Sequence, residues 1–402
     1  MVIKEFETFV VANPPPRFGG RYFIFIKLVT DTGIVGYGEV YCATFSAATV
    51  ESMLKDTAER YAVGHDPFHI ETLWRRVYGS GYNLRPDVSL VSVLSALEMA
   101  CWDIVGKACG KPAYELLGGR VHDRLRTYTY LYPESGDVYP EVDDPDHIYV
   151  NPYRAAERAL DYVAMGFNAL KFDPAGPYTV FDGGMPTGHE LERSAAFMRL
   201  IREAVGNGVD LLFGTHGQFS TAGAIRLARQ IELYDPLWFE EPVPPDNISS
   251  MASVARATSI PIATGERLCT KYEFARVLEE GAAAILQLNL GRVGGLLEAK
   301  KIASIAEVHS AQIAPHLYCG PIVGAANIQL AACTPNFLIL EGIETWGGFH
   351  ATLLETRIRW EEGYVIPSTE PGLGVSLNEK VARENPYSGG ALHLQMGSHP
   401  VR

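Results

Sequence analysis

The sequence predicts an α/β fold in which a TIM-type parallel barrel follows a smaller α+β domain. From Arg124 onward, short apolar segments alternate with amphipathic helical segments at a repeat of roughly 25 residues, which is the βα unit of a parallel barrel. Before Arg124, strand-like segments precede helical ones. The 402 residues are enough for one barrel, which commonly takes about 200 to 250 residues, and a second domain.

The first domain is expected to begin with strands and to continue with helices. Strand-like segments cover residues 2–11 and 21–29, and a turn at 31–33 leads into a third strand. Apolar residues then recur at helical spacing in segments 48–63, 69–78 and 88–110, and Gly110 and Pro112 mark the end of the last helix.

Eight strands are predicted in the barrel, and the carboxyl ends of barrel strands carry the chemistry. The strands are expected at residues 124–131, 168–173, 210–214, 237–241, 261–266, 283–289, 312–316 and 337–341. We therefore predict a capping domain at 1–123, a catalytic barrel at 124–345 and a tail at 346–402 that returns to the capping domain.

Composition excludes several classes of function. Thirty-four basic residues against 47 acidic ones give a net charge of −13, which disfavours binding to nucleic acid or to anionic membranes. The six cysteines lack metal-site spacing, which fits a reducing cytoplasm. We expect no signal peptide and no membrane span, because the first residues include acids and no apolar run reaches about 18 residues.

Polar residues end most of the predicted barrel strands, at positions Lys171, Asp173, Glu240, Glu241, Glu266, Asn289, His316 and Glu341. A single glutamate at such a position more often caps a helix or pairs with an arginine. A ring of carboxylates at one barrel face, however, requires cations to hold it together. Oxygen ligands of this kind predict a catalytic Mg²⁺ site with open positions.

Four loops are expected near the barrel mouth: residues 13–20, 79–87, 132–152 and 174–189. Loops on this face shape a substrate site or a contact between subunits, although each could equally be a surface excursion. The candidate substrate-binding side chains are Arg17, Tyr82, Arg85 and Tyr178, and a homo-oligomer is expected.

Several segments resemble those of the enolase superfamily, in its mandelate racemase subgroup. They are SALEMACWDIVGKACGKPAYELLGG (95–119), LWFEEPV (237–243), ATGERL (263–268), QLNLGRVGGLLEAKKIA (287–303) and PGLGVSL near the end of the chain. The resemblance implies a modified (β/α)7β barrel with a capping domain. The long loops and the segment GTHGQFS point to the acid-sugar dehydratases of this subgroup, such as galactarate or galactonate dehydratases.

The resemblance implies that Glu240 and Glu266 bind the metal ion. In the family, the third ligand usually lies on the third strand. Glu266 lies 26 residues after Glu240, and the position 26 residues before Glu240 is Gly214. Gly214 has no side chain, so the candidates are Asp173 and His216. We favour Asp173 as the ligand with His216 facing the substrate, and the reverse assignment stays open.

Proton transfer is implied at His316, which resembles the acid/base histidine of the subgroup. Its usual aspartate partner is here Asn289, and the usual pair of lysines is Lys171 with Asp173. The implied reaction is Mg²⁺-dependent removal of the proton next to a carboxylate, followed by loss of the β-hydroxyl to give a 2-keto-3-deoxy sugar acid. One of the two histidines, His316 or His216, would take the proton and the other would protonate the leaving group.

Two further side chains are expected to act on the substrate carboxylate. Lys171 would neutralise its charge, and Glu341 would donate a hydrogen bond if protonated. The expected substrate is a hexarate or hexonate such as galactarate or galactonate. An epimerase or a lactone cycloisomerase would use the same residues, and a barrel without activity that serves binding or scaffolding is the alternative from another class. The glycine-rich segments 36–40 and 291–296 lack a dinucleotide fingerprint.

Overall fold

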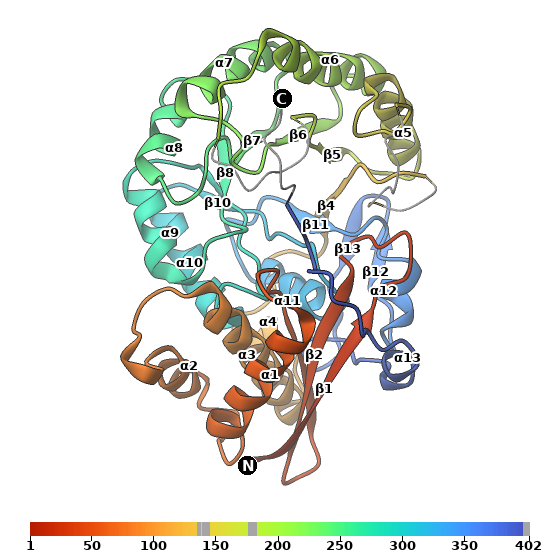
Figure 1. The fold of residues 1–402 in the computed structure, drawn as a ribbon. Coiled ribbons are helices and arrows are strands. Elements are labelled where there is room, and N and C mark those ends of the chain that lie inside the picture. Colours follow the sequence, from red (N-terminus) through yellow and green to blue (C-terminus); the bar gives the residue numbers. More distant parts are fainter. Residues whose placement is uncertain (135–137, 139–144, 176–182, 397–402) are drawn as a thin grey trace.

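The computed structural model describes residues 1–134, 138, 145–175 and 183–396. Figure 1 shows a barrel of strands surrounded by helices, with a second layer of strands and helices beneath it that is built from the first residues of the chain. The described part of the tail, up to residue 396, returns along this lower part and then runs towards the barrel (Figure 1).

The capping domain combines a three-stranded antiparallel sheet with helices. The sheet has the order β1 (Ile3–Ala12), β2 (Tyr22–Thr30) and β3 (Val35–Val40), and the helices are α1 (Ala47–Thr57), α2 (Ile70–Tyr78), α3 (Val88–Cys109) and α4 (Ala113–Leu116). A π-helical turn (Ala58–Ala62) and a 3₁₀ turn (Ser80–Tyr82) connect them.

Helix α3 is the central helix of the capping domain. Asp87 caps its N-terminus by accepting from two backbone N–H groups, and Gly110 ends it in the left-handed region with φ of 64°. By length and composition alone α3 could cross a membrane, but 83% of its apolar stretch is buried inside the protein. It is therefore a core helix.

Two glycines of β3 allow α3 to pack directly on the sheet. A Cβ on Gly36 would lie 2.2 Å from the carbonyl oxygen of Ala100, and one on Gly38 would lie 1.9 Å from that of Ala96. The glycine-rich segment of residues 36–40 thus serves close packing of backbone on backbone.

The barrel contains all eight predicted strands, in parallel and in chain order. They are β4 (Leu125–Tyr130), β5 (Ala169–Phe172), β6 (Asp210–Gly214), β7 (Trp238–Glu240), β8 (Ile262–Thr264), β9 (Ile285–Leu286), β10 (Gln312–Ile313) and β11 (Leu340–Gly342). Strand β11 pairs with β4, and a bridge from Ile313 to Phe337 joins β10 to the segment before β11, so the barrel closes.

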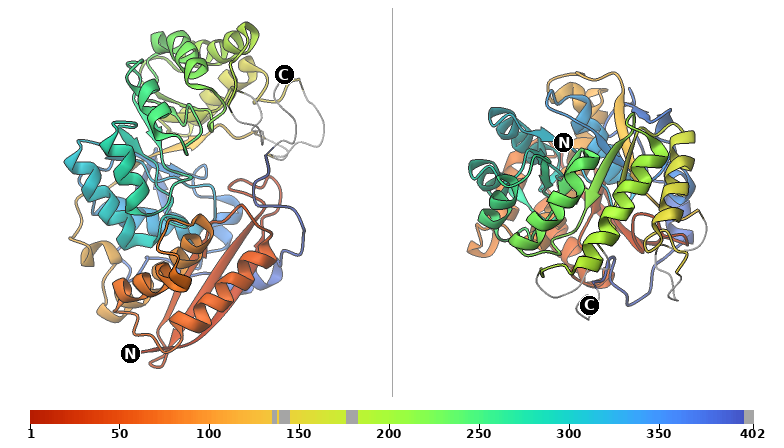
Figure 2. Two further views of the ribbon diagram at one scale, coloured as in Figure 1. Left: turned by 60° about the vertical axis from the view of Figure 1, so that its left-hand side comes forward. Right: turned by 90° about the horizontal axis from the view of Figure 1, so that it is seen from above.

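Seven helices follow the first seven strands on the outside of the barrel (Figure 2). They are α5 (Pro152–Ala164), α6 (Gly188–Val205), α7 (Thr221–Ile231), α8 (Ile248–Ala255), α9 (Thr270–Glu279), α10 (Gly295–Val308) and α11 (Pro321–Ala332). After β11 comes the short α12 (Gly348–Thr352). The expected (β/α)7β architecture is therefore confirmed for the described residues.

A compact apolar layer fills the interior of the barrel. Its buried members include Tyr128, Leu212, Trp238 and Ile339, which come from different strands. The barrel is therefore a packed support for its mouth rather than a channel.

The tail contacts both parts of the molecule. Strands β12 (Arg359–Glu361) and β13 (Tyr364–Ile366) form a hairpin, and β13 pairs antiparallel with the start of β4. Helix α13 (Glu379–Glu384) then packs near β1, where Arg383 pairs with Glu7. The backbone of Pro386 forms a bridge with Val11.

Buried carboxylates of the capping domain hold the first turns of two barrel helices. Glu98 on α3 accepts from the backbone N–H groups of Leu296 (2.7 Å) and Leu297 (2.8 Å) at the start of α10. A Cβ on Gly295 would lie 2.0 Å from Glu98 Oε2, so this glycine makes room for the carboxylate. The partial positive charge at a helix N-terminus favours such contacts.

Glu39 on β3 does the same for α11. It accepts from the backbone N–H groups of Gly320 and Val323, the latter at 2.9 Å, and it is fully buried. The capping domain is thus joined to the barrel by hydrogen bonds that reach the segment directly after His316.

Candidate active site at the barrel mouth

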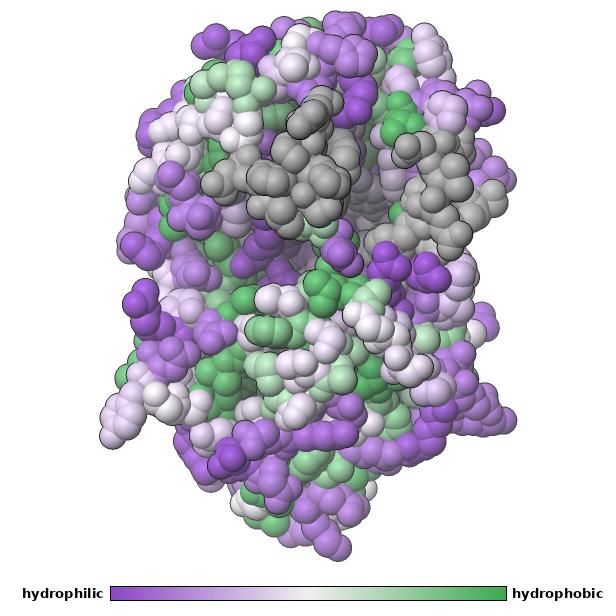
Figure 3. Space-filling view, in the orientation of Figure 1, coloured by the Kyte–Doolittle hydropathy of each residue, from purple (hydrophilic) through white to green (hydrophobic). Residues whose placement is uncertain are grey.

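The polar residues at the strand ends converge at the carboxyl ends of β5 to β11. Lys171, Asp173, Glu240, Glu266, His316 and Glu341 are all at least 92% buried, and His216 is partly exposed. Figure 3 shows a hollow between the barrel and the capping domain, with hydrophilic residues in it. The structure therefore gathers the predicted residues in one place.

Lys171 lies at the centre of the cluster. Its Nζ donates to Glu240 Oε1 at 2.7 Å and lies 3.6 Å from Glu341 Oε1. Burial alone would lower the pKa of Lys171, but the negative charges of Glu240 and Glu341 outweigh it and raise the pKa well above its ordinary value. The side chain is therefore a fixed positive charge and is not a candidate base.

The two adjacent glutamates at the end of β7 have different surroundings, because successive side chains of a strand point to opposite sides. Glu240 faces the cluster, where its Oε2 accepts from Trp238 Nε1 (3.1 Å) and Gln287 Nε2 (2.7 Å). Glu241 instead pairs with Arg267 at 2.6 Å. Glu241 is therefore a structural partner of an arginine, and Glu240 is available to the site.

Glu266 has an incompletely satisfied carboxylate. Its Oε2 is buried and makes no hydrogen bond with the described residues, although His316 Nε2 lies 3.2 Å away. Its Oε1 lies 3.8 Å from His216 Nε2. A buried carboxylate oxygen without a hydrogen bond requires an explanation, and a bound cation supplies one.

His216 and Asp173 form a pair. His216 Nδ1 lies 2.7 Å from Asp173 Oδ2, and Asp173 Oδ1 accepts from the backbone N–H of Ala175. Burial alone would lower the pKa of His216, but Glu266 and Asp173 outweigh it and raise the pKa. His216 has a positive φ of 49°. The N–H of Gly217, the residue after His216, donates to the carbonyl of Glu241, which has a positive φ of 40°. Such backbone is strained in residues with a Cβ and clusters at functional sites.

His316 lies between the cluster and Asn289. Its Nε2 is 3.2 Å from Glu266 Oε2 and 3.8 Å from Glu341 Oε2, whereas its Nδ1 is 2.9 Å from Asn289 Nδ2. Burial lowers the pKa of His316 to about 4, against the opposing charge of Glu266. Burial also raises the pKa of Glu341, although Lys171 opposes this effect.

The donor set fits a divalent cation. Ligand atoms of His216, Glu240 and Glu266 lie within 4.8 Å of one another. The carboxylates of Asp173, Glu240, Glu266 and Glu341 face the ammonium of Lys171 and two imidazoles, so the buried cluster carries more negative than positive charge. A cation bound by carboxylates would balance it.

The environment of Gly214 bears on the third ligand. A Cβ on Gly214 would lie 3.5 Å from Lys171 Cε and 3.9 Å from Asp173 Cβ, which are ordinary contacts. Asp173 therefore occupies the neighbourhood that a side chain at 214 would reach. By contrast, the group within 4.8 Å includes His216 and not Asp173. Geometry thus keeps both residues as candidates.

The predicted substrate-binding residues have different positions. The loop that carries Arg17 packs against the mouth, since Phe18 stacks on Tyr132 with ring centroids 4.4 Å apart. Tyr82 is 98% exposed and Arg85 is also exposed, so neither side chain is enclosed by the site. Tyr178 lies outside the described residues.

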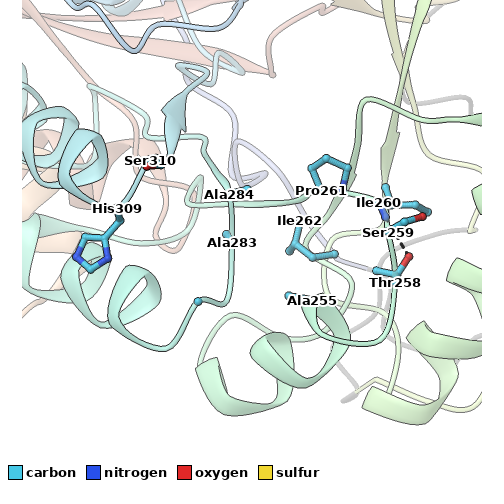
Figure 4. Close-up of a pocket in the computed structure, with 11 residues that line it drawn as sticks. Ala255, Thr258, Ser259, Ile260, Pro261, Ile262, Ala283, Ala284, His309 and Ser310 are labelled. Carbon is cyan, nitrogen blue, oxygen red and sulfur yellow. Dashed lines mark hydrogen bonds between the residues drawn. The ribbon is translucent and has the colours of Figure 1, made fainter.

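A separate pocket lies at the opposite end of the barrel strands. Its lining includes Pro261 and Ile262 at the start of β8 and Ala284 and Ser310 just before β9 and β10 (Figure 4). His309 also borders it, but no carboxylate does. The pocket has none of the chemistry of the barrel mouth.

Family models match both parts of the chain. Residues 13–118 match the mandelate racemase / muconate lactonizing enzyme N-terminal domain, and residues 154–381 match the enolase C-terminal domain-like family. The chain belongs to the mandelate racemase / muconate lactonizing enzyme family. The resemblance to the enolase superfamily is thereby confirmed.

Relatives within this family cover nearly the whole chain. The D-galactonate dehydratase of Ralstonia nicotianae is 36% identical over 93% of this chain and 92% of its own length. The D-gluconate/D-galactonate dehydratase of Picrophilus torridus is 33% identical over 96% of this chain and 95% of its own. A crystal structure of a candidate mandelate racemase/muconate lactonizing enzyme from Labrenzia alexandrii DFL-11 is 64% identical, covers both chains fully and has a TM-score of 0.96.

Several residues beside the barrel mouth of this protein were not predicted from the sequence. The ring of Tyr41 from the capping domain lies 5.9 Å from that of His316, and the guanidinium of Arg292 lies 4.2 Å over Tyr41. His393 of the tail lies 5.3 Å from Tyr41. No local pattern indicates these contacts, because 250 or more positions separate Tyr41 from Arg292 and His393.

Proposed function

We propose that this protein is a Mg²⁺-dependent acid-sugar dehydratase that removes the proton next to a carboxylate and eliminates the β-hydroxyl. The product is a 2-keto-3-deoxy sugar acid. The observation that carries this proposal is the cluster of buried carboxylates, lysine and histidines at the mouth, together with relatives named D-galactonate and D-gluconate dehydratase.

Glu240, Glu266 and Asp173 would hold the cation. These three carboxylates and open positions suit Mg²⁺, which commonly keeps sites for water and substrate oxygens. Asp173 is supported by its place beside Gly214, and with Asp173 as the third ligand His216 would serve proton transfer. When bound, the cation would supply positive charge to the substrate carboxylate as the neighbouring proton leaves.

The remaining residues of the cluster bind the substrate and move protons. Lys171 places a fixed positive charge beside the substrate carboxylate, and Glu341, whose pKa is raised by burial, can donate a hydrogen bond from its protonated form. The imidazoles of His216 and His316 stand on either side of Glu266. They are the side chains suited to proton transfer at neutral pH.

The substrate proposed is a six-carbon aldonate, with D-galactonate and D-gluconate first, because relatives of both names align along the whole chain. Galactarate is the next candidate. Arg17 would contact the far end of the sugar acid, whereas Tyr82, Arg85 and Tyr178 stay candidates for substrate binding from the sequence alone. The loop of Arg17 packs beside the mouth, where Phe18 stacks on Tyr132.

We further propose that the enzyme acts in the cytoplasm as a homo-oligomer. The six cysteines are all unpaired, which suits a reducing compartment. Gel filtration with light scattering tests the oligomeric state, and a single-chain mass of 44.1 kDa would contradict it.

The purified protein incubated with a panel of aldonates and aldarates tests the function. Formation of a 2-keto acid from at least one of them is expected, with loss of activity in EDTA and recovery on adding Mg²⁺. Mn²⁺ and Zn²⁺ serve as comparison ions. Epimerised substrate without 2-keto acid would contradict dehydration, and activity unchanged in EDTA would falsify the metal dependence.

A further inference from the structure

The backbones of two proposed metal ligands, Glu240 and Glu266, are held by different means. Glu240 is the last residue of β7, where it pairs with Ala263 of β8, and its carbonyl accepts from the N–H (3.2 Å) and Oγ1 (2.9 Å) of Thr215. Glu266 lies in a turn beyond the end of β8, outside the strand pairs of the barrel. The position of the Glu266 backbone must therefore be set by other contacts.

Arg292 supplies one of these contacts. Its Nη1 donates to the backbone carbonyl of Glu266 at 2.9 Å, and its side chain is buried. Arg292 lies in the turn that follows β9, where its own N–H donates to the carbonyl of Asn289 at 3.0 Å. A side chain from one strand end thus holds the backbone of a metal ligand at the neighbouring strand end.

The partners of Arg292 are not those of an ordinary buried arginine. Arg158, which is buried to a similar degree, pairs with Glu344 at 3.3 Å. Within the parts of the chain that the structure describes, Arg292 pairs with no carboxylate, and its contacts are the Glu266 carbonyl and Tyr41. Burial of a charge is costly unless it is paired and hydrogen-bonded. An ion pair therefore does not explain this buried guanidinium, and the groups that it touches become the candidates for its role.

Tyr41 of the capping domain holds the guanidinium of Arg292. The guanidinium carbon lies 4.2 Å from the centre of the Tyr41 ring, and Nε makes a long hydrogen bond of 3.5 Å to the Tyr41 carbonyl. The N–H of Tyr41 donates in turn to the carbonyl of Gly291 at 3.0 Å. An aromatic face attracts a cation, and the attraction is larger where water is excluded. The capping domain is therefore fastened to the turn after β9 at Arg292.

We infer that Arg292 is a positioning residue for the metal ligand Glu266 and that Tyr41 keeps Arg292 in the geometry this requires. This inference rests on the proposed function. The capping domain contributes to cation binding without supplying a ligand, because the contact runs from Tyr41 through Arg292 to the Glu266 backbone. Outer partners of this kind orient metal ligands, and their loss typically lowers metal affinity about 10- to 100-fold.

Arg292→Lys separates the geometry of this side chain from its charge. Lysine keeps a positive charge near the mouth, so the repulsion between that charge and a bound cation is retained. Its compact ammonium cannot both donate to the Glu266 carbonyl and lie flat on the Tyr41 ring. A lower Mg²⁺ affinity in this variant therefore reports lost positioning. An uncharged replacement would also remove the repulsion, and the two effects would oppose each other.

Calorimetric titration of Mg²⁺ into protein freed of metal with EDTA measures the effect without substrate. We expect Arg292→Lys to bind Mg²⁺ about tenfold more weakly than the natural protein. Urea denaturation checks that both proteins are folded. Equal affinity in the two proteins overturns the inference alone. A natural protein that binds no Mg²⁺ overturns the proposed function as well, so the two failures are distinguishable.

Tyr41→Leu tests the part of the capping domain, and it tests the inference by itself if Arg292→Lys does not fold. Loss of the ring should weaken Mg²⁺ binding about threefold, the usual size of a cation–π contact. Tyr41→Phe keeps the ring and should bind Mg²⁺ more tightly than Tyr41→Leu. The double variant Tyr41→Leu/Arg292→Lys should bind no more weakly than Arg292→Lys, because Tyr41 acts through Arg292. Additive losses, or an unchanged affinity in Tyr41→Leu, contradict the role of Tyr41.

Arg383→Lys is the matched control. Arg383 also lies over an aromatic ring, that of Phe9 at 4.8 Å, and it pairs with Glu7 of β1 and Glu379 of α13. These partners belong to the capping domain and the tail, so the Mg²⁺ affinity of Arg383→Lys should equal that of the natural protein. A loss as large as that of Arg292→Lys would show that the effect does not come from Glu266, and the inference would then be wrong.

Discussion

Buried carboxylates occur in two regions of this protein, and their surroundings differ. At the interface between capping domain and barrel, Glu39 and Glu98 each accept two or more hydrogen bonds from N–H groups. At the mouth, Glu240 and Glu266 face a lysine, two histidines and each other. Within the described parts of the chain, the buried Oε2 of Glu266 has no hydrogen-bond partner.

A structural carboxylate differs from a binding one in the groups that satisfy its oxygens. Burial is common to both regions, so burial alone is not informative. A carboxylate whose oxygens are satisfied by backbone N–H groups holds two parts of the fold together. A cluster with excess negative charge and an unsatisfied oxygen is complete only with a ligand. The two regions should therefore respond to mutation in opposite ways.

The largest effect on turnover is expected from the carboxylates at the mouth. Glu240→Gln or Glu266→Gln should abolish dehydration, because each removes a negative charge that the cation requires. The free energy of unfolding should stay near that of the natural protein, as measured by urea denaturation. Turnover that survives in either variant would show that the carboxylates at the mouth are not required for the reaction, and the proposed difference between the two regions would then be wrong. Glu203→Gln on the exposed surface of α6 is the control.

The next largest effect is expected from His316→Asn. Loss of a group that transfers or donates a proton at the reacting centre should lower the dehydration rate by about two to four orders of magnitude. Steady-state assay of the 2-keto acid measures it. A loss of less than tenfold would place His316 outside the chemistry.

Asp173→Asn and His216→Asn distinguish the two candidates for the third metal ligand. If Asp173 is the third ligand, Asp173→Asn should weaken Mg²⁺ binding as strongly as Glu240→Gln, measured by calorimetric titration. His216→Asn should leave Mg²⁺ affinity unchanged and remove the reaction. An exchange of these two results would assign the ligand to His216 and leave Asp173 as its orienting partner.

Glu98→Ala should affect stability and leave turnover per folded molecule nearly unchanged. It removes the acceptor of Leu296 and Leu297 at the start of α10 and of Trp102 Nε1. Each buried N–H without a partner costs about 1 to 3 kcal/mol of unfolding free energy. Urea denaturation measures this loss, and an unchanged midpoint would show that the contacts contribute nothing.

The smallest effect on turnover is expected from Glu39, whose contribution depends on pH. Burial raises the pKa of Glu39 to about 8. Between its ordinary pKa near 4.5 and pH 8 the folded protein holds a proton that the unfolded chain has released, so the free energy of unfolding falls as pH rises. Glu39→Gln, which is neutral at every pH, should make this dependence shallower. Denaturation curves at pH 5, 6.5 and 8 would show an unchanged slope if Glu39 does not titrate in this range.

Much of the barrel could be predicted from the sequence, because strand ends in a parallel barrel meet at one face whatever the details of packing. Lys171, Glu240 and Glu341 were expected at that face. In the structure, Lys171 Nζ lies 2.7 Å from Glu240 Oε1 and 3.6 Å from Glu341 Oε1. The separate surroundings of Glu240 and Glu241 follow from strand alternation, but the partner of Glu241, Arg267, lies 26 residues further on and no local pattern indicates it.

What could not be predicted depends on contacts between distant segments. The roles of Glu39 and Glu98 require knowledge of which helix N-termini they meet, about 200 or more residues further on. The sequence showed that the glycine-rich segments 36–40 and 291–296 lack a dinucleotide fingerprint. Their role in packing could not be predicted, because it depends on the positions of α3 and Glu98. The exposure of Tyr82 likewise depends on how its loop folds, which periodicity does not determine.

The residue at position 214 is not fixed by the fold. Its backbone does not need a glycine, and the space around a Cβ there is of ordinary size. A side chain at 214 would lie beside Lys171 and Asp173, above the apolar layer that supports the mouth. If Asp173 is the third ligand, this barrel can therefore carry that carboxylate on either of two neighbouring strands without a change of fold.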